Sequence, residues 1–248
     1  MCSSDLDHGN PDIRRTGILY LVIAHLSALA ILLSFGVLAE GDPSFDGIRH
    51  ATHTPFWANL AFGLALFGFG AKAGLIPLHV WLPEAHPAAP SPASALMSGV
   101  MLKTAIYGFL RVSFDLLDTH AWWWGVVTLA LGVSSALYGA IFSAVQSDMK
   151  RLLAWSSVEN IGLIFAGAGL ALIFQAYDMQ PFAALALTAM LYHCMNHACF
   201  KSLLFLCTGS VMHATRERAL GKLGGLIHRM PWVAWPALVG ALAVAGVP

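Results

Sequence analysis

The sequence predicts an all-α polytopic membrane protein, and three observations support this fold class. Hydrophobic residues make up 58% of the 248 residues and charged residues only 10%, whereas a soluble domain is typically about 25% charged. The mean hydropathy is +0.70. Apolar segments that approach or exceed the length of a membrane-spanning helix recur along the chain, with no alternating pattern typical of a β-barrel. The formal net charge is +0, which argues against a nucleic-acid-binding surface.

Seven spans are predicted, at residues 16–39, 55–79, 92–114, 121–145, 151–175, 181–212 and 232–248. The sixth is long for a single span and the seventh is short. Residues 12–248 are interpreted as one transmembrane domain, a fragment of a longer protein. Residues 1–11 are expected to be a non-native or disordered segment, because MCSSDL resembles a translated sequencing adapter.

The connections between these spans fall into two groups that differ in charge. One group carries eight cations: Arg14, Arg15, Lys150, Arg151, Arg216, Arg218, Lys222 and Arg229. The other carries Glu40, Asp42, Asp46, Asp115, Asp118 and Asp178, with only Arg49 and Arg111 as cations. The excess of positive charge predicts that the first group is cytoplasmic. The Pro-rich segment 80–91 is expected to be a loop on the same side.

Four ionisable residues remain inside the predicted spans: Lys72, Lys103, Glu159 and Lys201. Each costs roughly 2.5–3.5 kcal/mol at a helix centre, so such residues usually serve ion or proton pathways. With a rise of 1.5 Å per residue, Lys103 and Glu159 lie near the middle of the bilayer. An ionised carboxylate there needs a partner, so Glu159 is expected to pair with Lys103 or Lys201. A hydrogen bond to Asn160 or the backbone is the structural alternative.

The sixth span carries a polar stripe formed by His193, His197 and Lys201. Their spacing of four residues places them within about 80° of one helix face. Three titratable groups in register favour a proton path that faces Lys103. A structural role for either histidine is the alternative. A metal site lacks a third ligand, and a haem would need a facing histidine, for which His25 is the one deep candidate.

Pro77 predicts a break in the second span, because proline removes a helix donor and frees a carbonyl group. Broken helices at membrane depth border polar cavities. Gly70 and Gly74 flank Lys72, so we expect Lys72 to lie beside a hydrated break. Snorkelling of this lysine to the interface is the alternative. Proton transfer by such groups requires no cofactor.

Three long motifs resemble the antiporter-like membrane subunits of NADH:quinone oxidoreductase (complex I) and of the Mrp antiporters: KAGLIPLHVWLPEAHPAAPSPASALMSGVMLKTAIYGFLRV, SDMKRLLAWSSVENIGLI and LYHCMNHACFKSLLFLCTGSVMHAT. The details LPEAHPAAPS, LMSGVMLKT and SSVENIGL are most similar to component B of hydrogenase-4 and formate hydrogenlyase type complexes. The resemblance implies a fold of 14 helices with two inverted repeats, each containing one broken helix.

The resemblance also implies roles for individual residues. Lys72 matches the lysine before the first break, a central proton carrier, and Lys103 matches a lysine that relays protons onward. His193, His197 and Lys201 match the residues of the second broken helix. The family's glutamate partner of the first lysine and the ionisable residue of its twelfth helix fall outside residues 1–248.

The expected function is that of a proton-translocating membrane subunit of a hydrogenase or NADH:quinone oxidoreductase type complex. Its expected partners are the lipid bilayer, other membrane subunits, and protons or Na⁺. No cofactor is expected, because no Gly-rich nucleotide motif or Fe–S cysteine spacing occurs. The alternatives are an Mrp-type Na⁺/H⁺ antiporter subunit and a passive membrane anchor for an electron-transfer partner.

Overall fold

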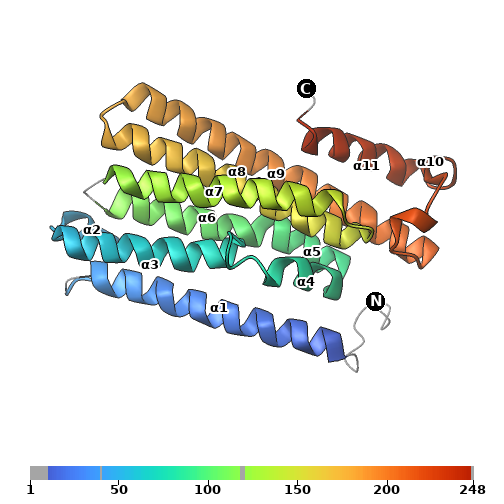
Figure 1. Cartoon of the computed structure of the whole chain (residues 1–248), viewed down its shortest axis with the longest axis horizontal. Coiled ribbons are helices and arrows are strands. Elements are labelled where there is room, and N and C mark those ends of the chain that lie inside the picture. The colour runs from blue at the N-terminus through green and yellow to red at the C-terminus, as the bar shows by residue number, and fades with distance from the viewer. Residues whose placement is uncertain (1–10, 40, 118–120, 247–248) are drawn as a thin grey trace.

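A computed structural model describes residues 11–39, 41–117 and 121–246, which form a bundle of roughly parallel and antiparallel helices (Figure 1). Nearly all of the predicted non-native segment 1–11 lies outside the described residues, as do Glu40 and Asp118. Among the described residues, five helical segments are long and apolar enough to cross a bilayer. These are Ile13–Leu38, Pro55–Ala73, Ser91–Leu116, Trp122–Ala144 and Met149–Ala176.

The helices follow the predicted spans closely. In chain order they are α1 (Pro11–Leu38), the short α2 (Phe45–His50), α3 (Pro55–Ala73), α4 (Trp81–Ala88), α5 (Ser91–Leu96), α6 (Leu102–Leu110), α7 (Trp122–Ala144), α8 (Met149–Ala176), α9 (Gln180–Thr215), α10 (Leu226–Arg229) and α11 (Pro231–Val244). Two π-helical turns, η2 (Met97–Met101) and η3 (Arg111–Leu116), lie before and after α6, and a 3-10 turn, η4 (Leu220–Lys222), follows α9.

The second predicted span is broken at Gly74, as Pro77 suggested. Gly74 ends α3 with a φ of 81°, and a Cβ atom there would lie 2.7 Å from Leu82 Cδ1. Glycine therefore fits both the left-handed backbone and the close contact. The backbone N–H of Ile76, in the segment between α3 and α4, donates to Ser135 Oγ of α7 at 2.9 Å. The break is thus anchored to a neighbouring helix.

The prediction of a loop at residues 80–91 is wrong, because residues 81–88 form helix α4, whereas the cytoplasmic location of this segment stays a prediction. Five residues of this helix are buried: Trp81, Leu82, Pro83, Ala85 and His86. Pro83 is tolerated because it is the third residue of the helix, where the backbone N–H has no acceptor within the helix. Helix α4 lies beyond the end of α3 and alongside α1 (Figure 1). The two helices therefore form one broken span, and Lys72 lies at the break.

The second broken helix implied by the resemblance does not fall at the polar stripe. Helix α9 runs without interruption through its 36 residues, so His193, His197 and Lys201 lie on continuous helical backbone. They keep their shared face along α9.

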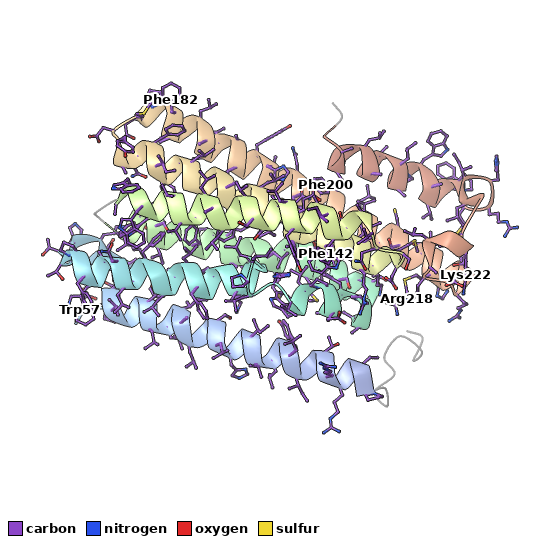
Figure 2. All side chains as sticks on the ribbon, viewed as in Figure 1. Trp57, Phe142, Phe182, Phe200, Arg218 and Lys222 are labelled. Carbon is purple, nitrogen blue, oxygen red and sulfur yellow. The ribbon has the colours of Figure 1, made fainter. Side chains whose placement is uncertain are left out.

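The two ends of the bundle separate the charged residues as the loop pattern predicted. At one end, Arg151 pairs with Glu84 at 2.8 Å and Arg218 pairs with Asp148 at 3.1 Å. At the other end, Arg49 pairs with Asp115 at 2.9 Å. Figure 2 shows Arg218 and Lys222 at the first end, and Trp57 and Phe182 at the other.

This separation leads to a labelling prediction. In a cysteine-free background, Thr52→Cys is expected to react with a membrane-impermeant maleimide in intact cells, because it lies in the connection with few cations. Gly221→Cys, in the cation-rich connection, is expected to react only after permeabilisation. Both positions lie in exposed connections between helices. Strong labelling of Gly221→Cys in intact cells would show that the orientation is reversed.

Candidate functional site

The buried polar groups of the bundle centre on a contact between α6 and α9. Lys103 Nζ is hydrogen-bonded to His197 Nδ1 and donates to the carbonyl oxygen of Ser98. The His197 ring is fully buried, and its Nε2 has no hydrogen-bond partner among the described residues. The structure thus brings together Lys103 and His197, which are 94 residues apart in the sequence.

Local backbone geometry positions Lys103 for this contact. It is the second residue of α6, directly after the π-helical turn η2. Such turns change the i→i+4 hydrogen-bonding pattern and often occur at functional sites. Here the Ser98 carbonyl, within η2, accepts from the Lys103 ammonium. The π-helical turn therefore supplies a hydrogen-bond acceptor for the lysine.

Lys201 lies further along the same stripe of α9 and is fully buried. Its Nζ donates to the carbonyl oxygen of Leu153 in α8 at 3.1 Å. The Ser157 hydroxyl donates to the same carbonyl at 2.9 Å and is hydrogen-bonded to the Ser98 hydroxyl at 2.9 Å. A continuous set of polar contacts therefore links Lys103 to Lys201 across η2, α8 and α9. Since backbone carbonyls carry no transferable proton, proton movement along it needs His197 or water.

His193 extends the stripe toward the other end of α9. Its ring centroid lies 6.5 Å from that of His197, and its Nε2 is buried without a partner among the described residues. No carboxylate of the described residues forms an ion pair with His193, His197, Lys103 or Lys201, since every ion pair found lies at an end of the bundle. Basic groups gathered without a paired carboxylate are costly to charge together, and Glu159 acts on Lys201 through its charge without forming an ion pair. The cluster is therefore suited to holding fewer protons than its four basic side chains could bind.

Lys72 lies at the last turn of α3, beside the break. It is half-buried and lines a cavity of about 20 Å³ with Tyr20 and Ser27 of α1 and Met101 of η2. This volume has room for about one water molecule. Lys72 makes no hydrogen bond or ion pair with the described residues. The structure therefore places it apart from the Lys103–His197 contact, on the side of the bundle covered by α1.

Glu159 forms no ion pair with Lys103 or Lys201 within the described residues, where each lysine is hydrogen-bonded to another group. Its carboxylate is nevertheless close enough to Lys201 for its charge to act on that lysine. Glu159 is half-buried on α8 and forms no hydrogen bond or ion pair there. Its backbone packs against α7, where a Cβ atom at Gly139 would lie 2.4 Å from the Glu159 nitrogen. It follows Ser157 by two residues, or about 200° around the helix. Glu159 therefore projects from the opposite face to the serine that meets Ser98.

Two further histidines, His79 and His86, are buried and were missed as candidates. His86 of α4 is fully buried, stacks on Phe205 of α9 at 4.6 Å, and has no hydrogen-bond partner for either ring nitrogen among the described residues. His79 packs against Trp155 at 5.4 Å. The spacing of Trp81, Leu82, Ala85 and His86 is typical of an amphipathic helix and could have indicated that His86 is buried.

The structure gives no candidate ligand set for a metal. Within residues 11–39, 41–117 and 121–246, no three His, Cys, Asp or Glu side chains gather closely enough to hold an ion.

The family match, the curated relatives and a solved structure all point to the same family of membrane proteins. Residues 6–248 match the family described as NADH:quinone oxidoreductase/Mrp antiporter, TM. Hydrogenase-4 component B of Escherichia coli (strain K12) is 44% identical over 236 residues, which cover 94% of this chain and 35% of that protein. Formate hydrogenlyase subunit 3 of the same organism is 43% identical over 186 residues, covering 75% of this chain and 30% of that protein.

The fold is also similar to a solved structure. A chain of the Mrp complex from Dietzia sp. DQ12-45-1b superimposes with a TM-score of 0.84 and 26% identity, over 94% of this chain and 42% of that chain. The chain therefore spans about a third of the curated relatives named above and less than half of the structural relative.

Proposed function

The chain belongs to the NADH:quinone oxidoreductase/Mrp antiporter membrane family, and on that basis we propose that it moves protons across the membrane. It does so as a non-redox subunit of a hydrogenase-4 or formate hydrogenlyase type complex. The observation that carries this proposal is the hydrogen bond between Lys103 and His197, deep in the bundle and without a carboxylate counterion among the described residues. Two basic groups in direct contact can share and pass one proton.

The proposed relay extends from this contact in both directions. His193 and Lys201 continue it along α9, and the water-sized cavity beside Lys72 connects α1, α3 and η2. Lys72 would load or release protons at the break near Pro77, where the helix is interrupted. Glu159 is proposed to act on the relay through its charge and not through a direct contact.

The partners proposed for the chain follow from its relatives. Hydrogenase-4 component B is by name a part of a hydrogenase, so we expect further membrane subunits to pack around this chain. The oxidoreductase chemistry belongs to those partners. The chain itself contributes the proton path.

An Mrp-type Na⁺/H⁺ antiporter subunit is a second candidate, favoured by the structural similarity to the Mrp complex. The described intramembrane groups are mostly basic, and basic nitrogens are poor ligands for Na⁺, which is a hard cation that prefers oxygen. Proton movement is therefore the better fit to this chain. Dependence of transport on Na⁺ concentration would favour the antiporter.

A passive anchor is the alternative that the intramembrane charges disfavour, and Lys72→Ala tests it. In the assembled complex this variant is expected to lower proton transfer about tenfold or more, because the ammonium group beside the break is removed. Assembly should be retained, since Lys72 has no partner among the described residues whose loss would leave an unsatisfied group. Proton uptake by inverted vesicles, normalised to assembled complex, is the measurement. Wild-type uptake with intact redox activity would support the passive anchor.

A further inference from the structure

A second polar cavity lies at the cation-rich end of the bundle, away from the proton relay. Its volume is about 260 Å³, and it is lined by Lys150 of α8, His213 of α9, Arg216 and Arg218 after α9, and Ser91 of α5. Figure 2 shows Arg218 near the end of α9 that forms this site. We propose that this cavity binds a phosphate group, with the headgroup of an anionic membrane lipid as its natural source.

The charge of the cavity is strongly positive. Three of its lining residues are cations, and none of those found by the structure is a carboxylate. The Arg218 guanidinium is partly neutralised, because it pairs with Asp148 at 3.1 Å. Asp148 also accepts from the backbone N–H groups of Lys150 and Arg151 at the start of α8. Asp148 therefore neutralises Arg218, whereas Arg216 forms no ion pair with the described residues, which leaves at least one uncompensated positive charge in the cavity.

The side chain of Lys150, which lines the cavity, is held in one position. Its side chain is almost fully buried, with 4% of the residue exposed, and Nζ donates to the Ala89 carbonyl at 2.8 Å. Arg218 donates in the same way to the carbonyl of Pro87 at 3.2 Å. Both cations are therefore held in place by carbonyl groups in the last turn of α4 and directly after it. A site whose charges are already positioned loses little side-chain entropy on binding an anion.

No contact within the described part of the fold explains why an arginine occupies position 216. It follows α9 in a left-handed conformation with a φ of 57°, and its N–H donates to the Met212 carbonyl. Helices usually place glycine or asparagine at such a position, and non-glycine residues in this region often occur at functional sites. The Arg216 guanidinium has no hydrogen bond or ion pair with the described residues. The carbonyl end of α9 carries about half a negative charge, which is less than the excess in the cavity.

The ligand chemistry follows from these groups. Guanidinium and ammonium groups donate several charge-assisted hydrogen bonds to phosphate oxygens. The volume is below the usual range for a whole drug-sized ligand, so a phosphate with part of its glycerol fits better than a nucleotide. Basic pockets between transmembrane helices on the cytoplasmic side bind anionic lipid headgroups, and the charge pattern predicts that this end is cytoplasmic.

The test uses the protein purified in its membrane complex, with lipid binding followed by native mass spectrometry. The probes are phosphatidylglycerol, phosphatidylcholine and, in lipid-depleted detergent, inorganic phosphate. Arg216→Asn removes the charge while keeping a residue that tolerates the left-handed conformation. It is expected to weaken phosphatidylglycerol binding about tenfold or more, because a charge-assisted hydrogen bond is lost. Arg229→Asn is the matched control, since Arg229 lies in the same connection but outside this cavity.

We expect the control to change the affinity by about twofold or less, because exposed charges are screened over about 8 Å. If phosphatidylcholine binds more weakly than phosphatidylglycerol, an anionic lipid is the source of the phosphate group. If inorganic phosphate competes with phosphatidylglycerol at equal strength, the free anion is the source. If Arg216→Asn unfolds, Arg216→Lys is expected to restore both folding and binding. Unchanged binding in folded Arg216→Asn, an equal loss in Arg229→Asn, or failure of Arg216→Lys to bind would overturn the proposal. None of these readouts depends on proton transfer.

Discussion

Replacing Lys103 with alanine is expected to leave the complex assembled but to reduce proton transfer about a hundredfold. Lys103 joins α6 to the buried stripe of α9 through His197, so its removal interrupts the relay at its centre. The stability of the protein should change little. The lost hydrogen bond of a charged group is worth about 1.5–3 kcal/mol, and removing a cation from the membrane interior recovers about 2.5–3.5 kcal/mol.

Lys103→Arg separates a proton carrier from a fixed positive charge. A guanidinium can still donate hydrogen bonds to His197 and to the Ser98 carbonyl, but it stays protonated at any physiological pH. If Lys103 passes protons, the arginine variant is expected to be nearly as inactive as the alanine variant. Recovery of transfer in Lys103→Arg would show that this residue supplies only charge.

The measurement is proton uptake by inverted vesicles, normalised to assembled complex. Lys222→Ala is the matched control, since Lys222 is a lysine at the end of the bundle that pairs with Glu217 at 3.3 Å. It is expected to transfer protons at the wild-type rate. Wild-type uptake in both Lys103 variants would exclude the residue from the relay.

The sequence was sufficient to predict the spans and the shared face of the stripe. Long apolar segments in lipid have few alternatives to a helix, because every backbone polar group needs a partner within the segment. The four-residue spacing of His193, His197 and Lys201 then determines their common face. The break also had a local signal, since Gly74 and Pro77 both disfavour a continuing helix.

The sequence failed where the outcome depends on contacts between distant segments. The segment that contains α4 is predicted to be a loop because it is short and rich in proline, whereas its burial depends on packing against α1 and α8. The contact of Lys103 with His197 depends on η2, a π-helical turn that has no proline to mark it. The expected Glu159 ion pair failed because charge and depth alone do not specify a helix face. The Gly139 contact does specify it, since it shows which side of α8 meets α7.

Gly132→Leu is expected to prevent stable folding, because α7 and α8 are in direct backbone contact at this glycine. A Cβ atom at Gly132 would lie 2.4 Å from the Ala166 nitrogen and 2.7 Å from the Gly162 carbonyl oxygen. The contact is reciprocal, since a Cβ atom at Gly162 would lie 2.4 Å from the Ala136 nitrogen. Small residues allow such close approach in membranes, where packing is a main source of helix association.

The clash at Gly132 cannot be relieved by a side-chain rotation, since the atoms that a new side chain meets belong to the backbone. The helices must separate, and overpacking of this kind costs about 1–3 kcal/mol or more. Separation would also displace the α8 carbonyl of Leu153, which holds Lys201. Gly63→Leu is the matched control, because nothing lies within 4 Å of a Cβ atom at that position in α3. The measurements are the yield of monodisperse protein after detergent extraction and its thermal midpoint. Normal yield and midpoint for Gly132→Leu would show that α7 and α8 are not packed this closely, whereas equal losses in both variants would point to a general intolerance of leucine for glycine.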